Sequence, residues 1–138
     1  FANALGRLAF ATSPLGARAA LRNIVYDADA VDEAFVADVG ERLRRPDAGE
    51  EFLAYLRHEF SPDGVRTSFA DEFPGLRLPT LFVHGREDPL IPVSWSERAA
   101  ERVPDAELAT FDDCGHWPPR ERPAEFNRTL AAFLDRTG

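Results

Sequence analysis

Two side chains in the second half of the chain are of types that could do acid–base chemistry together. Asp88 follows the apolar run Thr80–His84, and His116 follows a second run of strand-like residues, Glu107–Phe111. A histidine titrates near neutral pH, so its ring can take up a proton and return it. A carboxylate beside the ring fixes its tautomer and stabilises the imidazolium that forms. The pair is therefore a candidate acid and base for activating a nucleophile.

The elements around this pair predict that the two residues meet. Residues 80–84 have the pattern of a strand buried on both faces. A helix near 94–102 opens with a Ser94–Glu97 capping box, and a second strand follows. A helical crossover makes the two strands parallel, so both loops leave at one edge, where strands lie about 4.8 Å apart. Open α/β sheets place ligands at that edge. We expect an α/β fold in which the carboxylate and the imidazole are neighbours.

The first 75 residues have the character of a helical region. Helices are expected near 17–25, 30–44 and 49–60, besides an apolar stretch at 2–10. Asp29 is a plausible N-cap for the second of these helices. Phe35, Val39 and Leu43 recur every four residues there and form one apolar stripe. Ser61–Gly64 is a strong turn. The chain therefore divides into a helical region over 1–75 and a strand–helix–strand–helix region over 76–138, whose last helix starts at Pro123.

Composition excludes several classes of function. The 138 residues contain 24 Asp and Glu against 16 basic residues, giving a net charge of −8. Such a surface repels phosphates, so we expect no nucleic-acid partner. There is no run of about 18 apolar residues, so we expect no membrane span. One cysteine and three scattered histidines give no metal-ligand spacing. We expect no metal and no cofactor.

Two segments together resemble a known family. The stretch Leu78–Pro92, which contains a G-x-x-D sequence ending at Asp88, is similar to the segment after the lid of α/β-hydrolases. Cys114–Trp117, followed by Glu121–Pro123 and a helix, is similar to the segment that carries the family's catalytic histidine. The order Asp before His fits the family's order Ser, Asp, His.

The resemblance implies a fold and roles for the two residues. It implies a partial α/β-hydrolase fold, in which a helical lid over 1–75 precedes the last two parallel strands and their flanking helices over 76–138. Asp88 would be the acid and His116 the base of a Ser-His-Asp triad. The resemblance does not identify substrate-binding residues or an oligomeric state.

The nucleophile of the family is not among these residues. In the family it lies in a G-x-S-x-G elbow upstream of the lid, and no G-x-S-x-G occurs here. The chain begins at Phe1 and has no methionine. We therefore interpret it as a C-terminal fragment, inactive alone, of a cytoplasmic enzyme. The five serines lie in turn, lid or cap contexts: Ser13, Ser61, Ser68, Ser94 and Ser96.

Several functions remain open for the intact protein. Hydrolysis of carboxylic esters or related acyl substrates is the first interpretation; thioesters, lactones and carbon–carbon bonds beside a carbonyl are alternatives. An aspartate nucleophile upstream would instead make the protein a dehalogenase or an epoxide hydrolase. A third possibility is a ligand-binding member of the fold that has lost catalysis.

Other polar residues near the pair have plainer interpretations. Asp112 and Asp113 are rivals of Asp88 for the histidine, and are expected to be ordinary loop residues. His84 ends the first strand and is expected to be a hydrogen-bonded structural histidine. Cys114 is too close to His116 in sequence to attack in line with it, so a thiol nucleophile is not expected.

Overall fold

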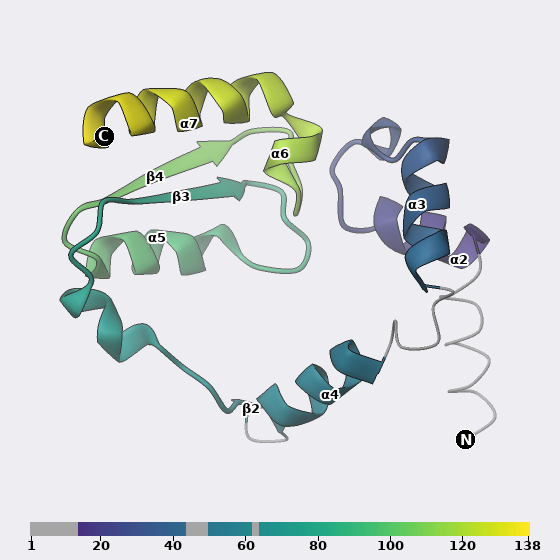
Figure 1. Ribbon diagram of the computed structural model, residues 1–138, viewed down its shortest axis with the longest axis horizontal. Coiled ribbons are helices and arrows are strands. Elements are labelled where there is room, and N and C mark those ends of the chain that lie inside the picture. The colour runs from purple at the N-terminus through teal and green to yellow at the C-terminus, as the bar shows by residue number, and fades with distance from the viewer. Residues whose placement is uncertain (1–13, 44–49, 62–63) are drawn as a thin grey trace. The chain divides into compact units, whose positions relative to one another are not determined.

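The computed structural model describes residues 14–43, 50–61 and 64–138 (Figure 1). These residues form two compact units. The first contains the described residues up to Leu21 together with Asp32–Phe69, and the second contains Arg22–Val31 together with Ala70–Gly138. The apolar stretch expected at 2–10 lies outside the described residues. Within the described ranges, every helix is too short or too polar to span a bilayer.

The second unit is the expected parallel strand pair with its helices. Strand β3 (Thr80–Gly85) leads through helix α5 (Val93–Arg102) to strand β4 (Ala106–Phe111). The two strands are parallel, with partners running from Thr80 opposite Ala106 to Gly85 opposite Phe111. Helices α6 (Pro118–Glu121) and α7 (Pro123–Thr137) follow. Figure 1 shows α5 on one side of the strands and α7 on the other. The predicted topology, and with it the α/β class, is confirmed.

The start of α5 differs from the prediction. Pro92 occupies the N-cap position with ψ of 133°, and no side chain caps the helix. Helix α5 therefore begins one residue before Ser94, which lies inside its first turn. The Ser94–Glu97 capping box is wrong, because extended backbone at Pro92 starts the helix too early for Ser94 to cap it. The start of α7 at Pro123 is as predicted, since proline has no N–H to lose in a first turn.

The first unit is mainly helical. It contains helices α2 (Pro14–Arg22), α3 (Glu33–Leu43) and α4 (Glu50–Glu59). Strand β1 (Phe60–Ser61) pairs antiparallel with β2 (Gly64–Val65), and residues 62–63 of the predicted turn lie outside the described residues. This hairpin was not predicted, because each of its strands is too short to show an alternating pattern.

The segment between α2 and α3 belongs to the second unit, not the first. A 3-10 helix, Ala28–Ala30, is capped by Asp27, whose side chain accepts from the N–H of Asp29. At the start of α3, Asp32 Oδ1 accepts from Phe35 N at 2.7 Å. Asp29 is therefore not the cap of α3, because the chain makes an extra turn first. The lid assignment over 1–75 stays a prediction, but the compact unit containing the strands also includes residues 22–31 and 70–75.

Candidate active site

Asp88 is held in the loop that leaves β3, and the loop folds around its carboxylate. Asp88 Oδ1 accepts hydrogen bonds from Leu90 N at 2.8 Å and Ile91 N at 3.1 Å. The Asp88 N–H donates to Gly85 O at 3.2 Å. The side chain is only 5% exposed. An Asp that accepts from the backbone two and three residues later forms a local turn by itself, so this loop presents the carboxylate in one orientation.

His116 meets that carboxylate from the loop that leaves β4. His116 Nδ1 lies 2.8 Å from Asp88 Oδ2, and the imidazole is 29% exposed. A carboxylate oxygen only accepts, so Nδ1 carries the hydrogen. The neutral ring then has its lone pair on Nε2. The structure thus brings the two predicted residues together, and leaves His116 able to take a proton at Nε2.

Burial and hydrogen bonding oppose each other at Asp88. Burial raises the pKa of the Asp88 carboxyl. The hydrogen bonds from His116, Leu90 and Ile91 together lower it by more than burial raises it, so the pKa of Asp88 lies below its ordinary value. Asp88 is therefore ionised at neutral pH and can stabilise a positive charge on the imidazole.

The loop that carries His116 lies directly against the end of β3. A Cβ at Gly85 would lie 2.0 Å from Gly115 O and 2.3 Å from Cys114 O, so only glycine fits there. Glu87 N donates to Cys114 O at 3.0 Å, and Glu87 Oε2 accepts from Cys114 N at 3.1 Å. The backbones after the two strands are therefore in contact, and this contact fixes the separation between the carboxylate and the ring.

A comparison with known families agrees with this geometry. The model of the alpha/beta hydrolase family matches residues 2–129. The chain belongs to the α/β-hydrolase family. A 2-hydroxy-6-oxononadienedioate/2-hydroxy-6-oxononatrienedioate hydrolase of Pseudomonas sp. is 35% identical over 94 residues, which cover 68% of this chain and 32% of the relative. A 2-hydroxymuconate semialdehyde hydrolase of Pseudomonas putida is 38% identical over 59% of this chain and 36% of its own length.

Solved structures show the same relationship. A meta-cleavage product hydrolase of Pseudomonas fluorescens, 28% identical, superposes with a TM-score of 0.77 and covers 91% of this chain and 47% of that one. A serine hydrolase involved in carbazole degradation superposes with a TM-score of 0.80 at 19% identity, which shows the fold alone. The chain spans about a third of the length of the two curated hydrolases above, and it corresponds to a part of the α/β-hydrolase fold.

The two rival carboxylates in this α/β-hydrolase chain are engaged elsewhere. Asp112 Oδ1 accepts from Arg86 Nε at 2.6 Å, and Arg86 also donates to Thr110 Oγ1 at 2.8 Å. A hydrogen bond with Asp113 raises the pKa of the Tyr26 hydroxyl. Neither carboxylate is the partner of His116 Nδ1, as the sequence analysis expected.

His84 is hydrogen-bonded through both ring nitrogens. Its Nε2 lies 2.9 Å from Ile91 O, a carbonyl that only accepts, so Nε2 carries the hydrogen. Nδ1 then accepts from the Ser96 hydroxyl at 2.7 Å. His84 is 8% exposed, and its Nε2 is 3.4 Å from Asp88 Oδ2. This confirms the structural interpretation of His84. Ser96 was missed, because twelve residues separate it from its partner and no short motif marks the contact.

Cys114 and metal binding can be assessed from the same loops. Cys114 is fully buried, and burial raises the pKa of its thiol to about 12. The thiol is therefore protonated at neutral pH and is no nucleophile. Among the described residues, no cluster of three or more His, Cys, Asp or Glu side chains could hold a metal ion.

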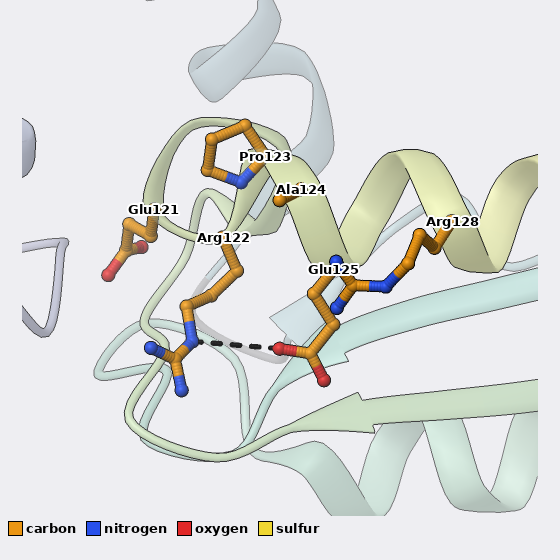
Figure 2. Close-up of a pocket in the computed structure, with 6 residues that line it drawn as sticks. All are labelled: Glu121, Arg122, Pro123, Ala124, Glu125 and Arg128. Atoms are coloured by element: carbon orange, nitrogen blue, oxygen red, sulfur yellow. Dashed lines mark ion pairs between the residues drawn. The ribbon is translucent and has the colours of Figure 1, made fainter.

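Two hollows beside the His116 loop are not lined by Asp88 or His116. One, of about 450 Å³, is lined by Tyr26, Asp27, Asp113, Glu121 and Arg122. The other, of about 380 Å³, lies at the start of α7. Figure 2 shows Arg122 reaching toward Glu125 in this second hollow, where the pair is 3.7 Å apart. Both hollows are lined largely by charged groups, unlike the mostly apolar pockets of small-molecule sites.

Proposed function

We propose that this chain supplies the acid and base of a hydrolase that cleaves a carbon–carbon bond beside a ketone. The hydrogen bond between Asp88 and His116, at 2.8 Å and with the ring proton on Nδ1, carries this proposal. The nucleophile lies outside these 138 residues, in the family's strand-to-helix elbow. Residues of the first unit are proposed to form part of a lid.

The relatives support this bond type over an ester. The substrates after which they are named contain hydroxyl, ketone, aldehyde and carboxylate groups, and no ester. A hydrolase acting on such a molecule has to cleave carbon–carbon bonds. The ester substrate that the sequence analysis put first is therefore replaced by a hydroxy-oxo-dienoic acid as the preferred substrate class. Esters remain the second class to be tested, because the same acid and base serve both.

Each residue has a defined part in the proposed reaction. The nucleophile adds its oxygen to the ketone carbon, and its proton moves to His116 Nε2. Asp88 stabilises the imidazolium through Nδ1. The enol of the substrate first shifts to its keto form, which makes the carbon beside the ketone saturated. The carbon–carbon bond then breaks, its electron pair is delocalised onto the substrate's second carbonyl oxygen, and the resulting hydroxydienoate fragment takes the proton back from His116. Water completes the cycle by releasing the remaining acyl group as a carboxylic acid.

The experiment uses the longer protein that contains this chain and its upstream elbow. The probe is 2-hydroxy-6-oxo-6-phenylhexa-2,4-dienoate, whose hydroxyl, double bonds and ketone are conjugated, so cleavage beside the ketone reduces its absorbance. A p-nitrophenyl ester is assayed in parallel. We expect turnover of the dienoate to exceed that of the ester, and His116→Ala to reduce kcat by about 10⁶-fold.

Three outcomes would contradict the proposal. Faster turnover of the ester would show that esters, not dienoates, are the preferred substrate class. Full activity of His116→Ala would show that His116 is not the base. Tight binding of the dienoate without any turnover would indicate a ligand-binding protein instead. The 138-residue chain alone serves as a control and is expected to turn over neither compound, because its base has no nucleophile to activate.

A further inference from the structure

Glu121, the last residue of α6, has no part in the proposed reaction, but its carboxylate accepts three hydrogen bonds from backbone N–H groups. Its Oε2 accepts from Tyr26 N at 2.7 Å and from Gly115 N at 2.9 Å. Its Oε1 accepts from Trp117 N at 3.0 Å. Hydrogen bonds from backbone N–H groups to a carboxylate are charge-assisted and are stronger than neutral ones. One side chain therefore fixes three peptide groups.

These three peptides surround His116. Gly115 and Trp117 are its two neighbours in the chain, and the N–H of His116 itself donates to Ile24 O at 2.8 Å. The backbone N–H groups of residues 115, 116 and 117 thus all have partners, two of them on Glu121. With its backbone held on both sides, the imidazole has little freedom to leave Asp88.

The third peptide comes from a distant part of the chain. Tyr26 is 95 residues before Glu121, in the segment 22–31 that connects α2 to α3. A Cβ at Gly115 would lie 2.7 Å from both Ile24 O and Tyr26 N, so this segment passes directly against the His116 loop. Arg120 adds a second link, since its Nε donates to Ala30 O at 2.7 Å.

We propose that Glu121 is a positioning residue that holds the base against the acid and couples the His116 loop to the segment 22–31. The inference rests on the proposed function in taking His116 as the base, whereas the hydrogen bonds of Glu121 do not depend on that function. Glu121 acts through the backbone on either side of His116, and none of its three hydrogen bonds involves the Asp88–His116 pair itself.

Glu121→Gln is the sharpest variant, because it keeps the shape of the side chain and loses one acceptor. An amide has one oxygen and one NH₂ group. If its oxygen accepts from Tyr26 and Gly115, its NH₂ faces the N–H of Trp117, and at least one hydrogen bond is lost. Glu125→Gln is the matched control: Glu125 belongs to α7, is partly exposed, and pairs with Arg122 (Figure 2).

The first readout needs no activity. The Nδ1 proton that His116 shares with Asp88 gives a separate downfield proton resonance in NMR spectra of the longer protein. We expect this resonance in the unaltered protein and in Glu125→Gln, and its loss or broadening in Glu121→Gln. A sharp, unshifted resonance in folded Glu121→Gln would overturn the proposal.

The second readout is kinetic. Glu121→Gln should reduce kcat by about 10²-fold, because small displacements of a catalytic group have effects of that size. Its KM should stay within about twofold, since Glu121 is not proposed to bind substrate. Unchanged kcat in folded Glu121→Gln would contradict the inference while leaving the proposed function intact. An unaltered protein that shows the resonance but no turnover would contradict the proposed function alone.

A third measurement on the unaltered protein covers the case in which Glu121→Gln does not fold. Scalar couplings through the hydrogen bonds should connect the Glu121 carboxyl carbon with the amide nitrogens of Tyr26, Gly115 and Trp117. Detecting all three couplings supports the proposal. Their absence from a spectrum in which backbone couplings of β3 and β4 are visible would overturn it.

Discussion

The loop after β3 and the loop after β4 present one member of the Asp88–His116 pair each, but they are held in different ways. The Asp88 loop is supported mainly by its own residues, with Asp88 accepting from the second and third residues after it. The His116 loop is held by nearby Glu121 and also by distant residues, because His116 N donates to Ile24 O and Glu121 in turn binds Tyr26 N. Asp88 is therefore preorganised by local sequence, whereas the position of His116 depends on the assembled second unit.

Among the tests of this comparison, removal of the Asp88 carboxylate has the largest expected effect. Asp88→Asn in the longer protein should reduce kcat by about 10⁴-fold, because an amide no longer fixes the productive tautomer of His116. Asp112→Asn is the control, since Asp112 pairs with Arg86, and it should leave kcat within about twofold. Equal effects of the two changes in steady-state kinetics would show that the rival carboxylate shares the role.

Cys114 reports on whether the His116 loop is assembled. With a pKa of about 12 instead of the ordinary 9.0, its thiolate fraction at pH 8 falls by about 10³-fold, and its reaction with a thiol reagent should slow at least as much. Full reactivity should return in denaturant. The labelling rate is measured from the absorbance of the group that the thiol reagent releases. Rapid labelling of the native protein would show that this loop opens readily.

Gly85 tests the contact between the two loops. Gly85→Ala should destabilise the protein by about 3 kcal/mol, because its Cβ would overlap the backbone of Cys114 and Gly115. Gly40→Ala, within α3 and with no atom near the new methyl group, should instead stabilise by about 0.5–1 kcal/mol. Urea unfolding of both variants measures the difference. Similar stabilities would mean that the two loops move apart without penalty.

The smallest effect concerns acid pH. The pKa of Asp88 is lowered in the folded state, so its carboxylate contributes stability above its unfolded pKa of about 3.9. That contribution is lost as pH falls through the folded value. The difference in unfolding free energy between the unaltered protein and Asp88→Asn should therefore shrink as the pH falls below about 4. If this difference in unfolding free energy instead grew on acidification, the pKa of Asp88 would be raised by folding, not lowered.

The same contrast explains what could be read from the sequence. The strands, their parallel pairing and the meeting of Asp88 with His116 follow from short-range patterns and one rule of topology. Glu121 was noticed only as part of a family motif, because its partner Tyr26 is 95 residues away in the chain and is brought to it by long-range packing. The prediction that Ser94 caps α5 was wrong for a related reason, because the backbone at Pro92, rather than the Ser94 side chain, decides where that helix begins.

The path of the chain between the two units has a practical consequence for engineering. The polypeptide enters the second unit at Arg22, leaves it after Val31 and returns at Ala70. A chimaera that exchanges the helical unit for that of another member of the family would thus need three junctions, and the ten residues between the first two should be retained from the recipient. A single splice near residue 75 would transplant the segment against which the His116 loop is built.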